Sequence, residues 1–205
     1  MAKGAETRRR IVARAAEVFN VYGFAGTSMG DLTRAAGIEK GGIYNHFASK
    51  EALALAAFDY AVDLMAERFS AATAGKERAL DRLLAIVGVF QNYLDAPPLR
   101  GGCPVLNTAI ESDDTSPTLR QRAQDAMTGW HKLIGSTVKA GVQRGDLRPD
   151  ADPRAVASLV TATLEGALML SKLYDDPAHM RRAVAHLTEY IESLAAPATS
   201  AGDQL

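Results

Sequence analysis

The fold is decided by residues 27–50, which read TSMGDLTRAAGIEKGGIYNHFASK. Ser28, followed three positions later by Asp31, forms a relaxed capping box, so we expect a helix to begin there. Gly37 is expected to end this helix in a tight turn, because glycine adopts positive φ angles freely. A second, very short helix is expected over residues 40–47. Two helices joined by such a short turn have the spacing of a helix-turn-helix.

The same stretch has an apolar side and a polar side. Leu32, Ile38, Ile43 and Phe47 are expected to hold the two helices against the preceding helix. The second helix must then present polar groups outward, because the major groove of DNA is read by hydrogen bonds. The side chains that meet this need are Lys40, Tyr44, Asn45, His46 and Lys50. Gly41 and Gly42 would allow a close approach of backbone to duplex, although each weakens the helix by roughly 0.8–1 kcal/mol relative to Ala.

Charge is unevenly distributed along the 205 residues. Residues 1–50 contain eight Lys and Arg against four Asp and Glu, whereas the whole chain has a net charge of −1. A basic head on an acidic body favours a polyanionic partner for the head. A chance asymmetry of a solvated surface is the alternative.

Helical periodicity continues through the rest of the chain and predicts an all-α fold. Apolar residues recur at three- and four-residue steps, and we find no alternating strand pattern of useful length. The helices are expected before residue 23 and over residues 49–69, 80–94, 117–144, 152–173 and 177–194. Breaks are expected at residues 71–76, 97–104, 113–117 and 145–150, and the segment 196–205 is expected to be a flexible tail.

Composition and motifs exclude several classes of protein. The single cysteine, Cys103, rules out an intrachain disulfide and favours the cytoplasm. The longest apolar run, residues 83–90, is far shorter than the ~20 residues of a membrane span, so no membrane partner is expected. The sequence Gly26-Thr27-Ser28-Met29-Gly30 matches a nucleophile elbow but lacks the strand that this motif needs. There is no phosphate-binding glycine loop or metal-ligand pair of histidines, so we expect neither an enzyme, a cofactor nor a metal.

The region from Gly23 to Leu53 resembles the DNA-binding domain of the tetracycline-repressor (TetR) family. The resemblance rests on Thr27–Leu32, on Ala35–Lys40 and on the continuous run from Gly41 to Leu53. It implies a homodimeric bacterial transcription repressor with about nine helices. Residues 1–50 would form the helix-turn-helix DNA-binding domain and residues 51–195 the ligand-binding and dimerisation domain. The two recognition helices of the dimer would enter successive major grooves of a pseudo-palindromic operator, and a small-molecule effector would release the DNA.

The resemblance also implies roles for individual residues. Thr27 and Ser28 would meet phosphate, Tyr44 and Lys50 would hold the DNA backbone, and base edges would be contacted by Lys40, Gly41, Gly42, Asn45 and His46. Gly42 departs from the family pattern, which often has Ser, Thr or Ala there, so a hydroxyl contact is missing. Simpler roles remain open: helix capping for Thr27 and Ser28, interhelical packing for Tyr44, and plain surface exposure for His46.

An apolar or amphipathic effector is expected to bind among apolar, aromatic and a few polar side chains of the body. The candidates are Phe58, Met65, Phe69, Phe90, Cys103, Asn107, Ile110, Glu111, Met127, Trp130 and Ile134, and each of the apolar ones could equally be plain core. Cys103 suggests an alternative function, a helical small-molecule-binding or electrophile-sensing protein whose head reads no specific DNA. A small buried residue is the simpler interpretation of Cys103.

The last two predicted helices are expected to form the dimer interface. Residues 159–173 are apolar on more of the helix surface than one buried face accounts for. The small residues there permit a second helix to approach closely. Two such helices from each protomer would complete a four-helix bundle. The predicted interface residues are Leu159, Thr163, Gly166, Leu170, Leu187 and Ile191.

Overall fold

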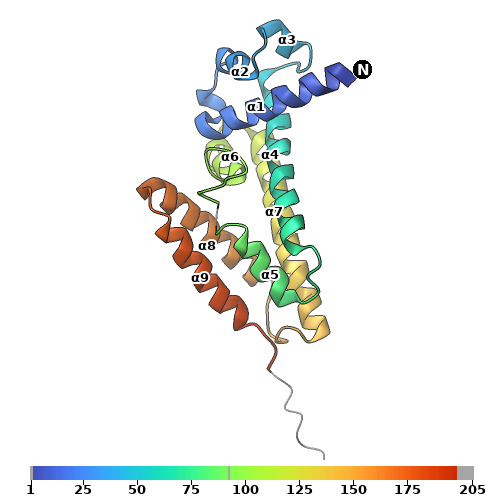
Figure 1. The fold of residues 1–205 in the computed structure, drawn as a ribbon, viewed down its shortest axis with the longest axis vertical. Coiled ribbons are helices and arrows are strands. Elements are labelled where there is room, and N and C mark those ends of the chain that lie inside the picture. Colours follow the sequence, from blue (N-terminus) through green and yellow to red (C-terminus); the bar gives the residue numbers. More distant parts are fainter. Residues whose placement is uncertain (1, 92, 198–205) are drawn as a thin grey trace, which may run out of the picture. The chain divides into compact units, whose positions relative to one another are not determined.

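The computed structural model describes residues 2–91 and 93–197; the predicted tail lies largely outside these ranges, at residues 198–205. The described residues form nine helices and no sheet, with one isolated β-bridge between Leu147 and Ala195 (Figure 1). The prediction of an all-α fold is therefore confirmed. The helices are α1 (Ala2–Gly26), α2 (Met29–Ala36), α3 (Lys40–Tyr44), α4 (Lys50–Thr73), α5 (Ala79–Gly88), α6 (Pro104–Ser112), α7 (Pro117–Arg144), α8 (Pro153–Tyr174) and α9 (Ala178–Glu192).

The chain forms two compact units that do not follow the order of the sequence. Unit 1 consists of Met1–Arg68 and Tyr93–Thr128, and unit 2 of Phe69–Asn92 and Gly129–Leu205. The division falls within α4 and within α7, so each of these long helices belongs partly to both units. The compact units therefore do not divide the chain after residue 50, where we expected the DNA-binding domain to end.

Unit 1 has its core beneath the predicted helix-turn-helix. Apolar side chains from α1, α2, α3 and α4 are buried together, among them Ile11, Ala15, Leu32, Ile43, Phe47 and Leu53. Five members of the whole cluster are alanines, which allow the helix backbones to approach closely. Burying a side chain the size of Ile or Leu contributes on the order of 2 kcal/mol, so this cluster fixes the three head helices and the start of α4 as one body.

Helix α1 changes direction at Gly23, where the backbone adopts φ 74° and ψ 170°. An L side chain rarely adopts this φ, so glycine suits the kink. The expected end of the first helix at this residue corresponds to the kink, after which helical structure continues to Gly26. The kink frees backbone N–H groups of the following residues from the regular helical pattern.

Unit 2 is built from α5, the later part of α7, α8 and α9. Helices α8 and α9 lie side by side, and α5 packs against α9 (Figure 1). Helix α8 begins as predicted, with Asp152 accepting a hydrogen bond from Arg154 N–H and with Pro153 in the first turn. Helix α5 is shorter than the predicted 80–94. It ends at Gly88, and residues 89–91 form turns.

Candidate nucleic-acid interface

Helix α2 is closed at both ends by its own sequence. The Asp31 N–H donates to Ser28 Oγ at 3.2 Å, while the Ser28 N–H donates to Asp31 Oδ2 at 2.9 Å. This reciprocal pair is the predicted capping box. The hydrogen bonds from the Ser28 hydroxyl and amide hold the pKa of Asp31 below its ordinary value. At the other end, Gly37 adopts φ 65°, ψ 36° and its N–H donates to the Thr33 carbonyl.

Helix α3 follows this turn and is held by packing. It spans Lys40–Tyr44 and therefore stops three residues short of the predicted end at Phe47, which lies directly after the turn at residues 45–46. Ile43 and Phe47 are 1% and 4% exposed, so both sides of this turn are anchored in the core of unit 1. The Phe47 and His46 amides still donate to the Ile43 carbonyl, which keeps the segment coiled.

The outward side of α3 carries the residues predicted to meet DNA. Lys40, Gly41, Tyr44 and Asn45 are exposed, and Ser28 is exposed at the start of α2. Gly42 and His46 are half-buried. The Lys40 ammonium lies 5.9 Å from the Tyr44 ring centroid, so these two side chains share one side of the helix. The result is a small polar and basic surface mounted on a rigid apolar base, as direct readout in the major groove requires.

Two of the side chains predicted to contact DNA make hydrogen bonds to the end of α1. Thr27 is only 3% exposed, and its hydroxyl donates to the Gly23 carbonyl at 2.6 Å. Lys50 donates to the Phe24 carbonyl, and its ammonium lies 4.3 Å from the centroid of the Phe24 ring. The expected phosphate contact by the Thr27 side chain therefore does not fit this structure, and Lys50 joins the start of α4 to the end of α1.

Helix α1 carries several basic side chains, of which Arg8 contacts the segment after α3. The Arg8 guanidinium lies over the Phe47 ring at 4.8 Å, so its charge is carried next to the end of α3. Arg9 pairs with Glu6 and Arg14 with Glu17 on the exposed face of α1. Of these α1 cations, Arg8 is the one in contact with the helix-turn-helix, while Arg9 and Arg14 are paired within α1.

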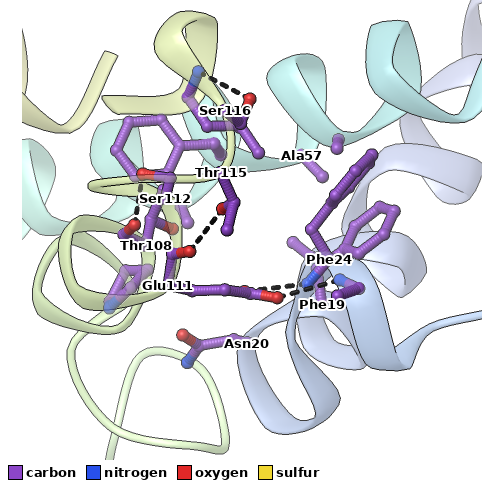
Figure 2. Close-up of a pocket in the computed structure, with 16 residues that line it drawn as sticks. Phe19, Asn20, Phe24, Ala57, Thr108, Glu111, Ser112, Thr115 and Ser116 are labelled. Carbon is purple, nitrogen blue, oxygen red and sulfur yellow. Dashed lines mark hydrogen bonds between the residues drawn. The ribbon is translucent and has the colours of Figure 1, made fainter. Parts of the chain in front are cut away.

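The end of α1 is tied to α6 at two points within unit 1. Asn20 Nδ2 donates to the carbonyls of Arg100 and Gly102, at 2.7 and 2.9 Å. Asn107 of α6 returns hydrogen bonds to the Asn20 carbonyl and side-chain oxygen. Beyond the kink, the Glu111 carboxylate accepts hydrogen bonds from Phe24 N–H and Ala25 N–H, at 2.9 and 2.8 Å (Figure 2).

A cavity of about 220 Å³ opens beside this junction, between α1, α4, α6 and the start of α7. Figure 2 shows Phe19 and Phe24 on one side, with Thr108, Glu111, Ser112 and Thr115 of α6 and the following turn opposite them. A second cavity, of about 10 Å³, lies in unit 2 and is lined by Phe69, Phe90, Trp130 and the buried Glu165, among others.

Two family models match this chain. Residues 11–57 match the model of the bacterial regulatory proteins of the tetR family, and residues 79–187 match the tetracyclin repressor-like C-terminal domain. The second match alone covers more than half of the chain. The chain belongs to the TetR family.

Solved structures of TetR-family regulators agree with this assignment. One from Chloroflexus aurantiacus is 49% identical, with 95% of this chain and 98% of that chain covered and a TM-score of 0.92. One from Cytophaga hutchinsonii is 36% identical, with 96% and 98% covered and a TM-score of 0.88. The transcriptional repressor DhaR of a Mycobacterium species is 29% identical over 174 residues, with 81% of this chain and 82% of DhaR covered. The protein is thus a DNA-binding transcriptional regulator of the TetR family, and the resemblance seen from Gly23 to Leu53 is confirmed.

The residues predicted to bind an effector are divided between the two units of this TetR-family chain. Phe58 and Glu111 line the cavity of unit 1, whereas Phe69, Phe90, Trp130 and Ile134 line that of unit 2. Met65 is fully buried, Met127 is half-buried, and Ile110 is 62% exposed. Asn107 is engaged with Asn20 and the Gly101 carbonyl, so its role here is to hold α6 against α1.

Cys103 occupies the N-cap of α6. Its side chain is 1% exposed and accepts a hydrogen bond from the Leu106 N–H at 3.5 Å. Burial limits access of an electrophile to this thiol, because reactive thiols are normally exposed. The structure therefore gives no support to the electrophile-sensing alternative.

The predicted dimer residues fall into two groups. On α8, Leu159 is 43% exposed, and Thr163, Gly166 and Leu170 are half-buried. On α9, Leu187 and Ile191 are completely buried within the chain, so they pack inside the protomer and are not open to a partner. The exposed apolar surface of α8 continues instead through Met169, Leu173 and Tyr174.

Helix α8 has the length and the apolar composition of a membrane-spanning helix. It is the one such helix within residues 2–91 and 93–197. Half of its most apolar window is buried in the protein. That burial, together with its packing on α9, is typical of a core helix.

The sequence reasoning missed Asn20 and the place where Glu111 acts. Asn20 lies four residues after Ala16, on the buried face of α1, and a polar residue at such a position is a signal that could have been noticed. For Glu111 no such signal exists, because its two partners lie 86 and 87 residues away in the sequence.

Proposed function

We propose that this protein is a homodimeric repressor that binds a pseudo-palindromic operator through α3 and leaves it when a small molecule binds. The observation that carries the proposal is the exposed polar side of α3, with Lys40, Tyr44 and Asn45, above the sealed core of Ile43 and Phe47. A TetR-family regulator of this kind works in the bacterial cytoplasm, where it meets the chromosome, and needs neither a cofactor nor a catalytic group.

Readout of DNA would rest on α3 and the residues around it. Lys40 is suited to guanine and Asn45 to adenine, because these are the pairings that side-chain geometry favours in the major groove. Tyr44 and the exposed Ser28 would contact phosphate. In a symmetric dimer the two copies of α3 would reach half-sites about one helical turn, or roughly 34 Å, apart, which is why the operator is expected to be an inverted repeat.

Dimerisation is proposed along the exposed apolar stripe of α8. Leu159, Ala162, Gly166, Met169 and Leu173 recur at three- and four-residue steps, so they form one continuous face. The small residues in the middle of the stripe allow a second helix to approach closely, and the larger ones at its ends supply apolar contact. A symmetric pairing buries the same stripe on both protomers.

Binding to the DNA upstream of the protein's own gene tests the proposal. Fluorescence anisotropy should show a fragment with an inverted repeat bound far more tightly than a shuffled fragment, and the affinity should fall steeply as salt rises, because phosphate contacts release counterions. Equal affinity for both fragments at every salt concentration would refute specific readout.

The dimer is tested separately by light scattering. We expect wild type to be a dimer at micromolar concentration and Leu159→Lys to weaken the dimer at least tenfold. Val21→Lys is the matched control, because Val21 is an apolar residue of similar exposure, 44%, on α1. A wild-type monomer would rule out the proposed assembly.

A further inference from the structure

We propose that the cavity of unit 1 binds a small aromatic molecule carrying one hydrogen-bond donor, and that this molecule loosens the hold of Glu111 on the end of α1. The cavity lies beside the residues that lead directly into the helix-turn-helix. The regulatory half of this inference, the effect of the ligand on DNA binding through Glu111, rests on the proposed function. The binding half, the occupation of the cavity by the ligand, does not.

The size and apolar wall of the cavity determine the body of the ligand. Phe19 and Phe24 form part of the wall, with ring centroids 6.1 Å apart, and Phe58 and five alanines of α1 and α4 form more of it. A dry engineered cavity of about 150 Å³ lined by apolar side chains takes up benzene. The 220 Å³ here therefore suits one or two fused rings.

The opposite wall determines the polar group of the ligand. The Ser112 hydroxyl donates to the Thr108 carbonyl, and the Thr115 hydroxyl donates to the Glu111 carbonyl at 2.6 Å. Each of these hydroxyls has committed its proton, so towards the cavity it can only accept. The Glu111 carboxylate also only accepts. A wall rich in acceptors calls for a ligand that donates, such as an indole, a phenol or an arylamine.

Glu111 connects this site with the DNA-binding head. Its two oxygens hold Phe24 N–H and Ala25 N–H, which are released from the regular helix by the kink at Gly23. The contact is so close that a Cβ built on Gly23 would lie 2.7 Å from Glu111 Oε1, and only glycine leaves room for the carboxylate. A ligand donor that competes for these oxygens weakens the hold on the segment just before Ser28.

The other attachment of α1 to α6 sets the limits of the movement. Asn20 remains fixed by the carbonyls of Arg100 and Gly102 and by Asn107, and none of these groups depends on Glu111. Release of Glu111 therefore frees the three residues after the kink while the body of α1 stays in place. A change confined to this segment acts on the connection between α1 and α2, and so on the capping box at Ser28 where α2 begins.

Isothermal titration with indole and with indene tests the site. The two molecules have the same shape, but only indole has an N–H donor, so we expect indole to bind at least tenfold more tightly. Thr115→Val removes one acceptor without changing the shape of the side chain and should weaken indole several-fold while leaving indene unchanged. Thr137→Val is the matched control, because the Thr137 hydroxyl makes the same bond to a carbonyl one turn earlier on a helix of unit 2.

A second variant, Ala54→Leu, fills the cavity and should abolish binding of both compounds. Equal affinities for indole and indene, or indole binding that survives both substitutions, would overturn the assignment of the site. Thermal denaturation of each variant shows whether it is folded before it is titrated.

The regulatory half is tested by measuring operator affinity with and without saturating indole. We expect a fall of tenfold or more in wild type and no fall in Ala54→Leu. Indole that binds at the cavity but leaves the affinity unchanged would refute the coupling through Glu111. A protein that binds indole yet never binds specific DNA would instead refute the proposed function, so the two failures are distinguishable.

Discussion

Helix α2 is closed at both ends by its own residues, whereas the neighbouring α3 has no side-chain hydrogen bond at its N-cap, Glu39. Helix α2 has eight residues and α3 only five, of which two are glycines. An isolated helix of five residues is unstable in water. The comparison teaches that α2 is maintained by local capping, while α3 exists because Ile43 and Phe47 are buried under it.

This difference suits a recognition element. Because α3 is fixed from below, the exposed side chains of Lys40 and Asn45 on its outer side are available for the base contacts proposed above. The same dependence makes α3 sensitive to any change in the core or in the segment that leads into α2.

The largest effect is expected when the packing under α3 is removed. Ile43→Ala should lower the free energy of unfolding by about 3 kcal/mol, because a fully buried Ile loses both its transfer energy and its packing. Urea denaturation followed by circular dichroism measures this loss. Ile110→Ala, at a position 62% exposed, should change stability by less than about 0.5 kcal/mol. A comparably small loss for Ile43→Ala would contradict the dependence of α3 on packing.

Lys40→Ala should separate recognition from stability. We expect operator binding to weaken by about 1–3 kcal/mol and the base preference to relax, while unfolding stays within about 0.5 kcal/mol of wild type. Anisotropy titrations with the operator and with single-base variants measure both. Lys139→Ala, an exposed lysine of α7, is the control for loss of charge alone. Uniform weakening on all sequences would show that Lys40 contacts phosphate instead.

Removing the cap of α2 should have a smaller effect. Ser28→Ala is expected to lower the free energy of unfolding by about 1 kcal/mol at neutral pH. The Asp31 N–H loses its acceptor, and the Asp31 carboxylate loses the hydrogen bond from the Ser28 hydroxyl. The pKa of Asp31 is lowered in the folded protein, so its stabilising contribution is present above the unfolded pKa and is lost as pH falls below about 4.

The difference between wild type and Ser28→Ala should therefore shrink on acidification. Denaturant titrations from pH 6 to pH 3 check this. Ser49→Ala is the control, since Ser49 Oγ accepts from Ala52 N–H at 3.0 Å without an Asp partner of the same kind. A constant difference for Ser28→Ala across this range would mean that Asp31 adds nothing to the cap.

The smallest effect is expected from Gly41→Ala. A Cβ at this position meets nothing within 4 Å, so the substitution should raise the free energy of unfolding by about 0.5–1 kcal/mol through helix propensity. Gly30→Ala in α2 is the matched change, with Ser28 Oγ at 3.5 Å. If operator affinity falls only for Gly41→Ala, the backbone of α3 approaches the duplex closely; a fall of equal size in both variants would argue against that approach.

Much of the site was predictable because its signals are local. The capping box at Ser28, the turn at Gly37 and the polar tips on α3 lie within one short stretch, and their chemistry follows from neighbours in the sequence. The errors concern contacts over long distances in sequence. The Thr27 hydroxyl is suited to phosphate, yet the fold buries it against the Gly23 carbonyl, and Lys50, whose DNA contact stays a prediction, also bonds the Phe24 carbonyl.

The helix ends show the same limit. Gly88 ends α5 six residues before the predicted end. The apolar residue Phe90 that continues the pattern is still buried, but it lies in a turn and not in a helix. Periodicity reports which side chains are buried, but it does not report whether the backbone between them is helical.

The sequence by itself determined the helical class, the helix-turn-helix and the exposed polar face of α3, because helix period, caps and turns are set by residues a few positions apart. Only the tertiary structure decided that Leu187 and Ile191 are interior, that Asn20 fastens α1 to α6, and that Glu111 holds Phe24 and Ala25 beside a cavity. Those contacts join residues tens of positions apart, and their geometry depends on how the helices pack, which no local pattern encodes.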